Sequence, residues 1–228
     1  AFSGEYFDGH HYFVESVDKG AVALVGSRSP ESLEADGITL PHDIPYAKAE
    51  NPRAALAHLA AAFYAFPSQN MTVIGITGTD GKTTTANIVE SILIEATRSP
   101  DFPDGRVGVI STVSARMCGQ ESDTGFHVTT PDSPAVQRYL AEMGRAGCQF
   151  AIIESTSQGL AQHRVDAVNF DVGAITNIPH EHIDWHGSRD AYIVAKGMLF
   201  RMLFEPAENT ASRSRFAILN ANDEGTPE

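Results

Sequence analysis

The sequence predicts an α/β fold, with a central, doubly wound and mostly parallel sheet and a small N-terminal α/β domain before it. From residue 71 onward, short apolar runs alternate with longer helical patterns, which is typical of repeated strand–helix units. The apolar runs are continuous, which favours parallel strands that are covered on both faces. The turn-like segment 67–70 separates the two regions, so we expect domains over 1–66 and 67–228.

The expected elements follow from these patterns in chain order. In the first domain, they predict helices over 12–19 and 52–66 and strands over 21–25 and near 38–40. Pro52 opens the second of these helices, in the first turn, where proline is favoured. In the second domain, they predict strands over 71–77, 107–110, 149–154, 172–176 and 216–220, and helices over 83–97, 134–146 and 189–204.

The composition disfavours several classes of protein. Hydrophobic residues make up 42% and charged residues 20% of the 228 residues, as in an ordinary globular protein with a core. No apolar run approaches ~20 residues, so we expect no membrane span, and the net charge of −13 argues against a nucleic-acid-binding surface. No secretory signal is visible, and Cys118 and Cys148 are too few for a disulfide framework and lack metal-ligand spacing, so we expect a reducing, cytoplasmic location.

The most informative segment is 71–85, where an apolar strand stops at a glycine-rich turn and a helical pattern follows. Gly78 and Gly81 allow the backbone to approach a ligand closely, and loop N–H groups together with a helix N-terminus bind phosphate. Lys82 can reach the outer phosphates of a nucleoside triphosphate, and the Thr83 hydroxyl can bind Mg²⁺. The segment therefore predicts a P-loop with the sequence Gly78-Thr79-Asp80-Gly81-Lys82-Thr83-Thr84.

This loop departs from the standard pattern in two ways. Ile76 stands where that pattern has its first Gly, so the loop is a shorter variant. Asp80 puts a carboxylate beside phosphates, which repels them unless Mg²⁺ or a proton offsets its charge. The alternative is an ordinary strand-to-helix turn that happens to be rich in small residues. The sequence Gly-Lys-Thr-Thr directly after a buried strand argues against this alternative.

Polar residues follow three of the predicted strands, at the sheet edge where ligands of such folds bind. Besides the P-loop, these residues include Glu154 after one strand, and Asn177 and a histidine-rich run with His182 after another. Near a nucleotide, oxygen ligands with one imidazole at most fit Mg²⁺. The alternatives are a solvated carboxylate at Glu154 and a polar loop over 180–186, and the zinc motif HExxH fails because Asp stands at its second His position.

Five motifs, in their order and spacing, resemble the Mur ligases, the ATP-dependent peptide-bond-forming enzymes of bacterial cell-wall synthesis, and the MurE type in particular. They are GITGTDGKTT over 75–84, TTP over 129–131, ESTSQGL over 154–160 with QHRV over 162–165, TNIPHEHIDWHG over 176–187, and AKGMLF over 195–200. The resemblance covers nearly the whole chain. Asp80 stands where the family usually has Asn, Thr156 where Ser is commoner, and Gln158 where His is commoner.

The resemblance implies a role for each matching residue. The P-loop residues and Asn177 bind ATP, with Lys82 on its phosphates. Mg²⁺ is bound by Thr83, Glu154 and His182, and Lys196 matches the lysine that family members carbamylate, an adduct that helps to organise the Mg²⁺ sites. From the residues alone, Lys196 would be a lysine whose ammonium group reaches water. Lys82, Glu154, His182 and Lys196 are thus the implied catalytic residues, and contacts to UDP-muramoyl-dipeptide are implied for Thr129, Thr130, Thr156, Gln162 and Arg164.

The implied reaction joins an amino acid, meso-diaminopimelate or L-lysine, to UDP-N-acetylmuramoyl-L-alanyl-D-glutamate. A substrate carboxylate attacks the γ-phosphate of ATP, and the amine of the amino acid then displaces phosphate from the acyl phosphate. Residues 1–66 resemble the later half of the family's UDP-sugar-binding domain, and nothing resembles its C-terminal ligase domain. We therefore expect a fragment with both ends cut, which is inactive alone.

Two alternatives remain open at this stage. One is a Mur-like ligase that acts on another substrate, such as a lipid-linked muramoyl peptide or a polymer of the cyanophycin type. The other is a nucleotide-binding homologue without ligase activity. The departure from the family pattern at Asp80 is the feature that favours this alternative. The Thr-Thr-Pro and Gln-x-Arg elements favour the MurE-type reaction over the first alternative.

Overall fold

The computed structural model describes residues 1–228 except 5–6, 112–113, 124–129, 179–182, 205–212 and 224–228. The chain divides into two compact units, Ala1–Leu56 and Ala57–Glu228, and the division falls within helix α3 (Pro52–Phe63). The functional division at 66/67 stays a prediction. No helix in the described ranges combines the length and the apolarity that a membrane span requires.

The N-terminal unit is a small α/β unit built on two parallel strands. It contains η1 (Gly9–Tyr12), α1 (Phe13–Asp18), β1 (Leu24–Gly26), α2 (Pro30–Ala35) and β2 (Tyr46–Lys48). The strand predicted near 38–40 is wrong, because the N–H of Ile38 bonds to the carbonyl of Leu33 at 2.9 Å and ends α2. Ile38 instead packs in the core of this unit with Phe13 and Leu24.

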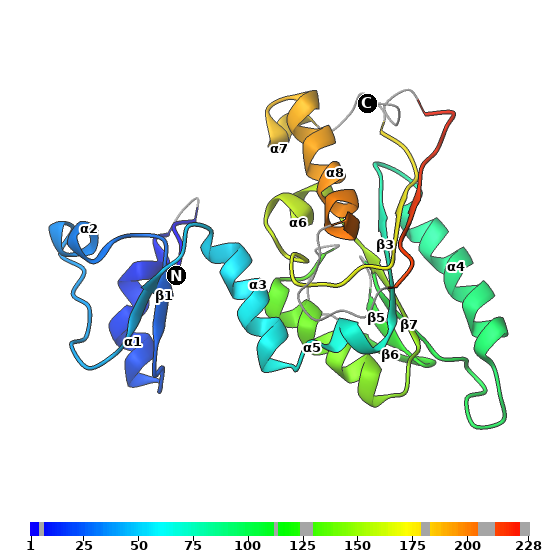
Figure 1. The fold of residues 1–228 in the computed structure, drawn as a ribbon, viewed down its shortest axis with the longest axis horizontal. Helices are drawn as coiled ribbons and strands as arrows, with labels where there is room; N and C mark the ends of the chain where they lie inside the picture. Colours follow the sequence, from blue (N-terminus) through cyan, green and yellow to red (C-terminus); the bar gives the residue numbers. More distant parts are fainter. Residues whose placement is uncertain (5–6, 112–113, 124–129, 179–182, 205–212, 224–228) are drawn as a thin grey trace. The chain divides into compact units, whose positions relative to one another are not determined.

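The second unit contains the predicted doubly wound, mostly parallel sheet (Figure 1). Within the described residues, seven strands lie in the order β6-β5-β4-β7-β3-β8-β9. The parallel strands are β4 (Val107–Ile110), β7 (Phe150–Glu154), β3 (Thr72–Thr77), β8 (Val172–Ile175) and β9 (Phe216–Ile218). Every parallel strand expected from the sequence is present within one to two residues.

Helices cover both faces of this sheet, and the side chains of each strand alternate between them. Helix α4 (Lys82–Thr97) covers one face, where it packs with Ile76 and Ile152. Helices α5 (Ser133–Arg145) and α8 (Arg189–Phe204) pack on the other, against Val73 and Ile153. This two-sided burial explains why the strands are apolar at consecutive positions.

The sequence did not predict four elements of the second unit. The two antiparallel strands β5 (Ser114–Met117) and β6 (Gln120–Asp123) extend the sheet at one edge. Their two-residue turn has positive φ at Cys118 (46°) and Gly119 (83°), which matches the twist of a hairpin. The other two are the short helices α6 (Ser157–Ala161) and α7 (Ile183–His186), and the turn at 67–70 forms η2 (Pro67–Asn70).

Candidate nucleotide and substrate site

The predicted P-loop joins the end of β3 to the start of α4. Gly78 and Gly81 have φ of 136° and 78°, values that L-residues rarely adopt. A Cβ at Gly78 would also overlap the hydroxyl of Thr176, so this glycine is required by both conformation and space. No described side chain caps α4, whose first-turn N–H groups have no acceptor within the helix. The loop and helix together can therefore present several donors to an anion.

Lys82 is the first residue of α4, and its ammonium group turns back over the loop. It donates to the carbonyl oxygens of Gly78 at 3.0 Å and Thr79 at 2.8 Å. Burial lowers the pKa of Lys82, and the negative charges of Glu154 and Asp80 oppose that shift. The ammonium group therefore lies among negatively polarised oxygens at the loop, where a phosphate can take their place.

Glu154 lies at the end of β7 and is completely buried. The β3–β7 register pairs it with Ile76, which brings its carboxylate beside the P-loop. Its Oε2 atom accepts a hydrogen bond from the Thr83 hydroxyl at 2.9 Å. The alternative of a solvated carboxylate is therefore wrong, and the strand end and the loop form one site.

The Thr83 and Glu154 oxygens fit Mg²⁺. Both are hard donors, and Mg²⁺ in nucleotide sites usually takes one or two carboxylates and completes its shell with phosphates and water. No group of three or more His, Cys, Asp or Glu side chains that could hold a metal occurs in the described part of the chain. One hydroxyl and one carboxylate leave most of the Mg²⁺ shell to phosphates and water, so this pair suits a cation that arrives with a nucleotide.

Thr176 and Asn177, which directly follow the adjacent strand β8, hold the P-loop. The Asn177 Oδ1 atom accepts from the backbone N–H groups of Thr79 at 3.1 Å and Asp80 at 2.9 Å. The Thr176 hydroxyl donates to the carbonyl of Asp80 at 2.6 Å. Asn177 thus orders the loop in this structure, and its contact with ATP stays a prediction.

Lys196 is buried in α8, with 1% of its surface exposed. Its Nζ atom lies 4.5 Å from the ring centroid of Tyr192, one turn earlier on the same helix. Burial and, to a smaller extent, the positive charge of Lys82 lower its pKa to about 7, although the negative charge of Asp80 opposes the shift. A large fraction of this lysine is therefore a neutral amine at neutral pH, the form that reacts with CO₂. The expectation that its ammonium group reaches water is wrong.

Tyr192 is a site residue that the sequence did not reveal. Its hydroxyl bonds to the Thr79 hydroxyl at 2.8 Å, and its ring packs beside Lys196. It thereby connects the P-loop to α8. The only signal in the sequence was its spacing of four from Lys196, which puts both on one helix face.

Four of the predicted substrate residues form one hydrogen-bonded cluster beside Glu154. The Thr130 hydroxyl donates to the Glu154 carbonyl at 3.0 Å and accepts from the Thr156 N–H at 3.0 Å. The guanidinium of Arg164 donates to the carbonyl of Thr130 and, at 2.7 Å, to Oε1 of Gln162. The structure thus brings Thr130, Thr156, Gln162 and Arg164 to the edge of the sheet that carries the P-loop.

Two predicted site residues, Thr129 and His182, lie outside the described residues. The end of the histidine run forms α7, where the ring of His186 packs against that of Tyr192 at 5.3 Å between centroids. Burial and then the charge of Lys196 lower the pKa of His186. The metal roles predicted for His182 and Lys196 therefore stay predictions.

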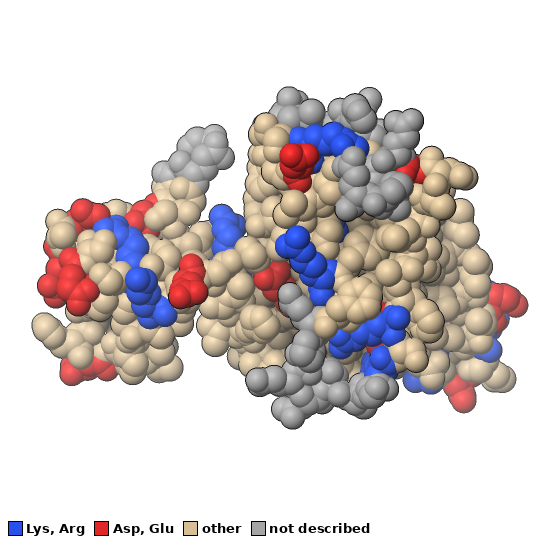
Figure 2. Space-filling view, turned by 45° about the horizontal axis from the view of Figure 1, so that its top comes forward, with Lys and Arg blue, Asp and Glu red and all other residues tan. Residues whose placement is uncertain are grey.

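The charged side chains do not form one broad field on the face seen in Figure 2. Lys and Arg side chains lie there in small groups, close to Asp and Glu side chains. At the candidate site, the local groups that can bind an anion are the backbone amides at the start of α4 and the ammonium group of Lys82.

Comparison with known families shows which family the chain belongs to. The model of the Mur ligase middle domain matches residues 76–227. The chain belongs to the Mur ligase family. This Mur ligase chain is 40% identical over 227 residues to the UDP-N-acetylmuramyl-tripeptide synthetase of Deinococcus radiodurans, a match that covers 99% of the chain and 41% of that protein.

Two further matches agree. The UDP-N-acetylmuramoyl-L-alanyl-D-glutamate–2,6-diaminopimelate ligase of Geobacter metallireducens is 37% identical over 223 residues, with 98% of the chain and 40% of that protein covered. A solved structure of a ligase with the same name has a TM-score of 0.67 at 18% identity and covers 93% of the chain and 43% of its own, which supports the fold. The Mur ligase chain thus spans about two fifths of the relatives that it matches.

Proposed function

We propose that this chain is the ATP-binding part of a ligase that adds an amino acid to UDP-N-acetylmuramoyl-L-alanyl-D-glutamate in peptidoglycan synthesis. Within it, residues 67–228 bind ATP, and residues 1–66 belong to a UDP-sugar-binding domain. The C-terminal ligase domain that the family resemblance implies supplies recognition of the amino acid. The relatives named for the diaminopimelate reaction make meso-diaminopimelate the first candidate and L-lysine the second. We also propose a cytoplasmic location, as the sequence predicts.

The hydrogen bond between Thr83 and Glu154 is the observation that carries the proposal. It joins the first turn of α4 to the end of β7, so a hydroxyl and a buried carboxylate meet beside the loop glycines. An ordinary strand-to-helix turn has no need of a buried acid at that point. Oxygen donors beside anion-binding amides are what a nucleotide with Mg²⁺ requires.

In the proposed reaction, the chain's own groups position ATP and neutralise charge. Loop amides and Lys82 hold the β- and γ-phosphates while the substrate carboxylate attacks the γ-phosphorus, which gives an acyl phosphate and ADP. Thr83 and Glu154 would hold Mg²⁺, which would supply positive charge to the phosphates. The amine of the amino acid then attacks the acyl carbon, phosphate leaves, and the amine loses a proton.

Lys196 and the threonine cluster complete the proposed site. Lys196 in its neutral amine form adds CO₂ through a new N–C bond and releases one proton, and the resulting carbamate is an anion near Lys82. Thr130 and Thr156 hold the muramoyl-dipeptide, and Arg164 binds a carboxylate or phosphate with its planar fork. The hydrogen bonds of this fork to Thr130 and Gln162 fix its orientation before the substrate binds.

The test is phosphate release by the full-length protein with ATP, Mg²⁺, UDP-muramoyl-dipeptide and either amino acid. We expect release that requires all four components, and its loss in Lys82→Ala. Ser91→Ala is the matched control, because Ser91 lies on the exposed side of the same helix and its hydroxyl donates to the carbonyl of Asn87 in the preceding turn. Absence of substrate-dependent phosphate release in the wild type would overturn the proposal.

A further inference from the structure

Two cysteines that are 30 residues apart in the sequence meet at one edge of the second unit. The Sγ atoms of Cys118 and Cys148 are 2.7 Å apart, and both are free thiols. A disulfide bond is about 2.04 Å long, so closing this pair requires an approach of less than about 1 Å. The two thiols are therefore already placed for a bond between them.

The backbone of the sheet holds this contact in place. Cys118 follows β5, and its N–H donates to the carbonyl of Val107 at the start of β4. Cys148 precedes β7, and the next residue, Gln149, donates to the carbonyl of Arg106 at 2.8 Å. The two cysteines thus lie next to the strands that flank β4, Cys118 after β5 and Cys148 before β7, both near the start of β4.

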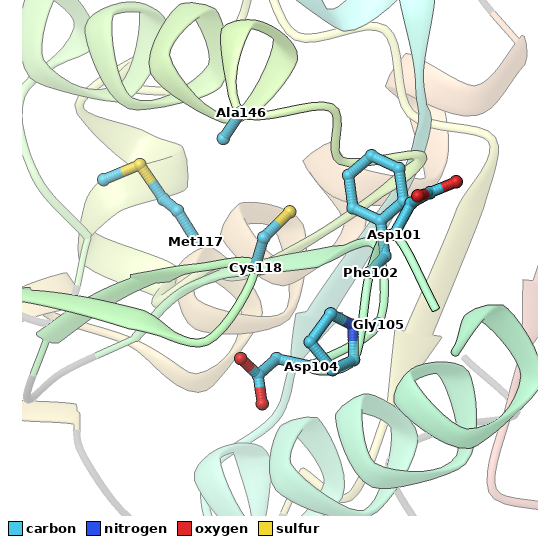
Figure 3. Close-up of a pocket in the computed structure, with 8 residues that line it drawn as sticks. Asp101, Phe102, Asp104, Gly105, Met117, Cys118 and Ala146 are labelled. Carbon is cyan, nitrogen blue, oxygen red and sulfur yellow. The ribbon is translucent and has the colours of Figure 1, made fainter. Parts of the chain in front are cut away.

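The two thiols differ in their access to solvent. Cys118 lines an open cavity of about 380 Å³, and in Figure 3 its sulfur points toward the side formed by Ala146 and Phe102. Cys148 is buried, with 6% of its surface exposed, and does not line the cavity. Burial and then the hydrogen bond with Cys118 raise the pKa of Cys148. A small oxidant therefore reaches Cys118 first and finds a second thiol directly behind it.

The backbone conformation of Cys118 is a further argument for a specific role of this residue. It occupies the first position of the two-residue hairpin turn, with a φ of 46°. Asn, Asp and Gly are preferred there, because they adopt positive φ at lower cost than other residues. Turn formation does not account for a cysteine at this position, and the contact with Cys148 does.

We propose that Cys118 and Cys148 form an oxidisable dithiol, in which a hydroperoxide oxidises Cys118 and Cys148 resolves the product as an intramolecular disulfide. With hydrogen peroxide, the Cys118 thiol becomes a sulfenic acid and one water is released. The Cys148 sulfur then attacks the Cys118 sulfur and displaces the hydroxyl group, which leaves as a second water with the Cys148 proton. Two thiols and one peroxide thus give one disulfide and two waters, and a reducing dithiol reverses the change by exchange.

The crosslink joins the β5–β6 hairpin to the start of β7, at the edge of the sheet opposite to the P-loop. Glu154 lies at the other end of β7, so the dithiol is separate from the proposed nucleotide site. Disulfides in reducing compartments are usually transient and redox-sensing. The proposed dithiol therefore does not depend on the proposed ligase reaction, and either proposal can fail without the other.

The experiment treats the native chain with hydrogen peroxide, removes the peroxide, alkylates in denaturant and maps the peptides. We expect both thiols to escape alkylation, a linked pair of tryptic peptides 117–138 and 146–164, and recovery of both thiols with dithiothreitol. Cys148→Ser should accumulate a dimedone-reactive sulfenic acid at Cys118. Cys118→Ser should retain an alkylatable Cys148, because that thiol is buried.

A second measurement tests whether the folded structure favours the disulfide or whether the two thiols are merely close to each other. In a glutathione redox buffer, the equilibrium constant for the intramolecular disulfide should be at least about tenfold larger in the native chain than in guanidinium, because folding raises the effective concentration of one thiol at the other. Equal constants would overturn the proposal. So would peroxide-treated native chain in which Cys148 stays alkylatable, or in which disulfides form only between chains.

Discussion

The buried Lys196 makes stability depend on pH in a way that Lys196→Met should abolish. Its pKa of about 7 in the folded chain lies below the ordinary value of 10.5. Between these values the unfolded chain binds more protons than the folded chain, so the free energy of unfolding rises with pH. Below about pH 7 both states are protonated, and the full cost of burying the charge is present. That cost is about 5 kcal/mol from the difference in pKa.

The assay is urea unfolding of wild type and Lys196→Met at pH 7 and pH 9. The wild type should gain about 2 kcal/mol between these pH values relative to the variant, because over that range the folded chain gives up the Lys196 proton while the unfolded chain keeps it. Buried groups with raised pKa, such as Tyr192 and Cys148, act in the opposite direction. They are present in both proteins, so their effect cancels in the comparison. Methionine has nearly the length of lysine and leaves little space unfilled.

Lys48→Met is the matched control, because Lys48 is exposed and its replacement should leave the pH dependence unchanged. At pH 7, Lys196→Met should be more stable than wild type. If wild type and Lys196→Met show the same change in unfolding free energy from pH 7 to pH 9, the buried cation does not exist as described and the reasoning is refuted.

Three further predictions concern the packing and the loop. Gly75→Ala should lose about 1–3 kcal/mol of unfolding free energy, because its Cβ would lie 2.6 Å from a methyl group of Leu199; Gly197→Ala, with open space around it, should lose none. Asn177→Ala should weaken ATP binding about tenfold in a titration, since two loop amides lose their acceptor, and unchanged affinity would contradict its loop-ordering role. Thr156→Ala should cost about 1 kcal/mol in urea unfolding, because Thr156 caps α6, whereas Thr156→Ser should restore most of it.

The parallel core of the fold was predictable because its signals are local and strong. Strands such as β3 and β7 are buried on both faces, so each reads as one apolar run between turns. The β5–β6 hairpin was missed for the opposite reason, since it is an edge addition with polar residues and a Cys-Gly turn in place of Asn-Gly. Ser29 and Pro30 are residues that favour a helix start, and they begin helix α2. We did not predict this helix because the surrounding segment is rich in proline.

The site was predictable in its parts and less so in its connections. Placing Glu154 at a strand end required only the sequence, but its bond to Thr83 depends on β7 lying next to β3, which strand order along the chain does not give. The burial of Lys196 depends on how α8 packs, and its helix is apolar on several sides, so the sequence did not indicate which face is covered. Both features depend on contacts between segments far apart in the sequence, which local sequence patterns do not reveal.

The most direct test of the account is Mg²⁺-dependent ATP binding, measured by calorimetric titration with and without Mg²⁺. The account predicts that Mg²⁺ tightens binding in the wild type, that Lys82→Ala weakens it at least about tenfold, and that Glu154→Gln removes the effect of Mg²⁺. Ser91→Ala should bind like the wild type. Equal affinity in all four proteins, or wild-type binding that is indifferent to Mg²⁺, would contradict the claim that this loop and the neighbouring strand end form one nucleotide site.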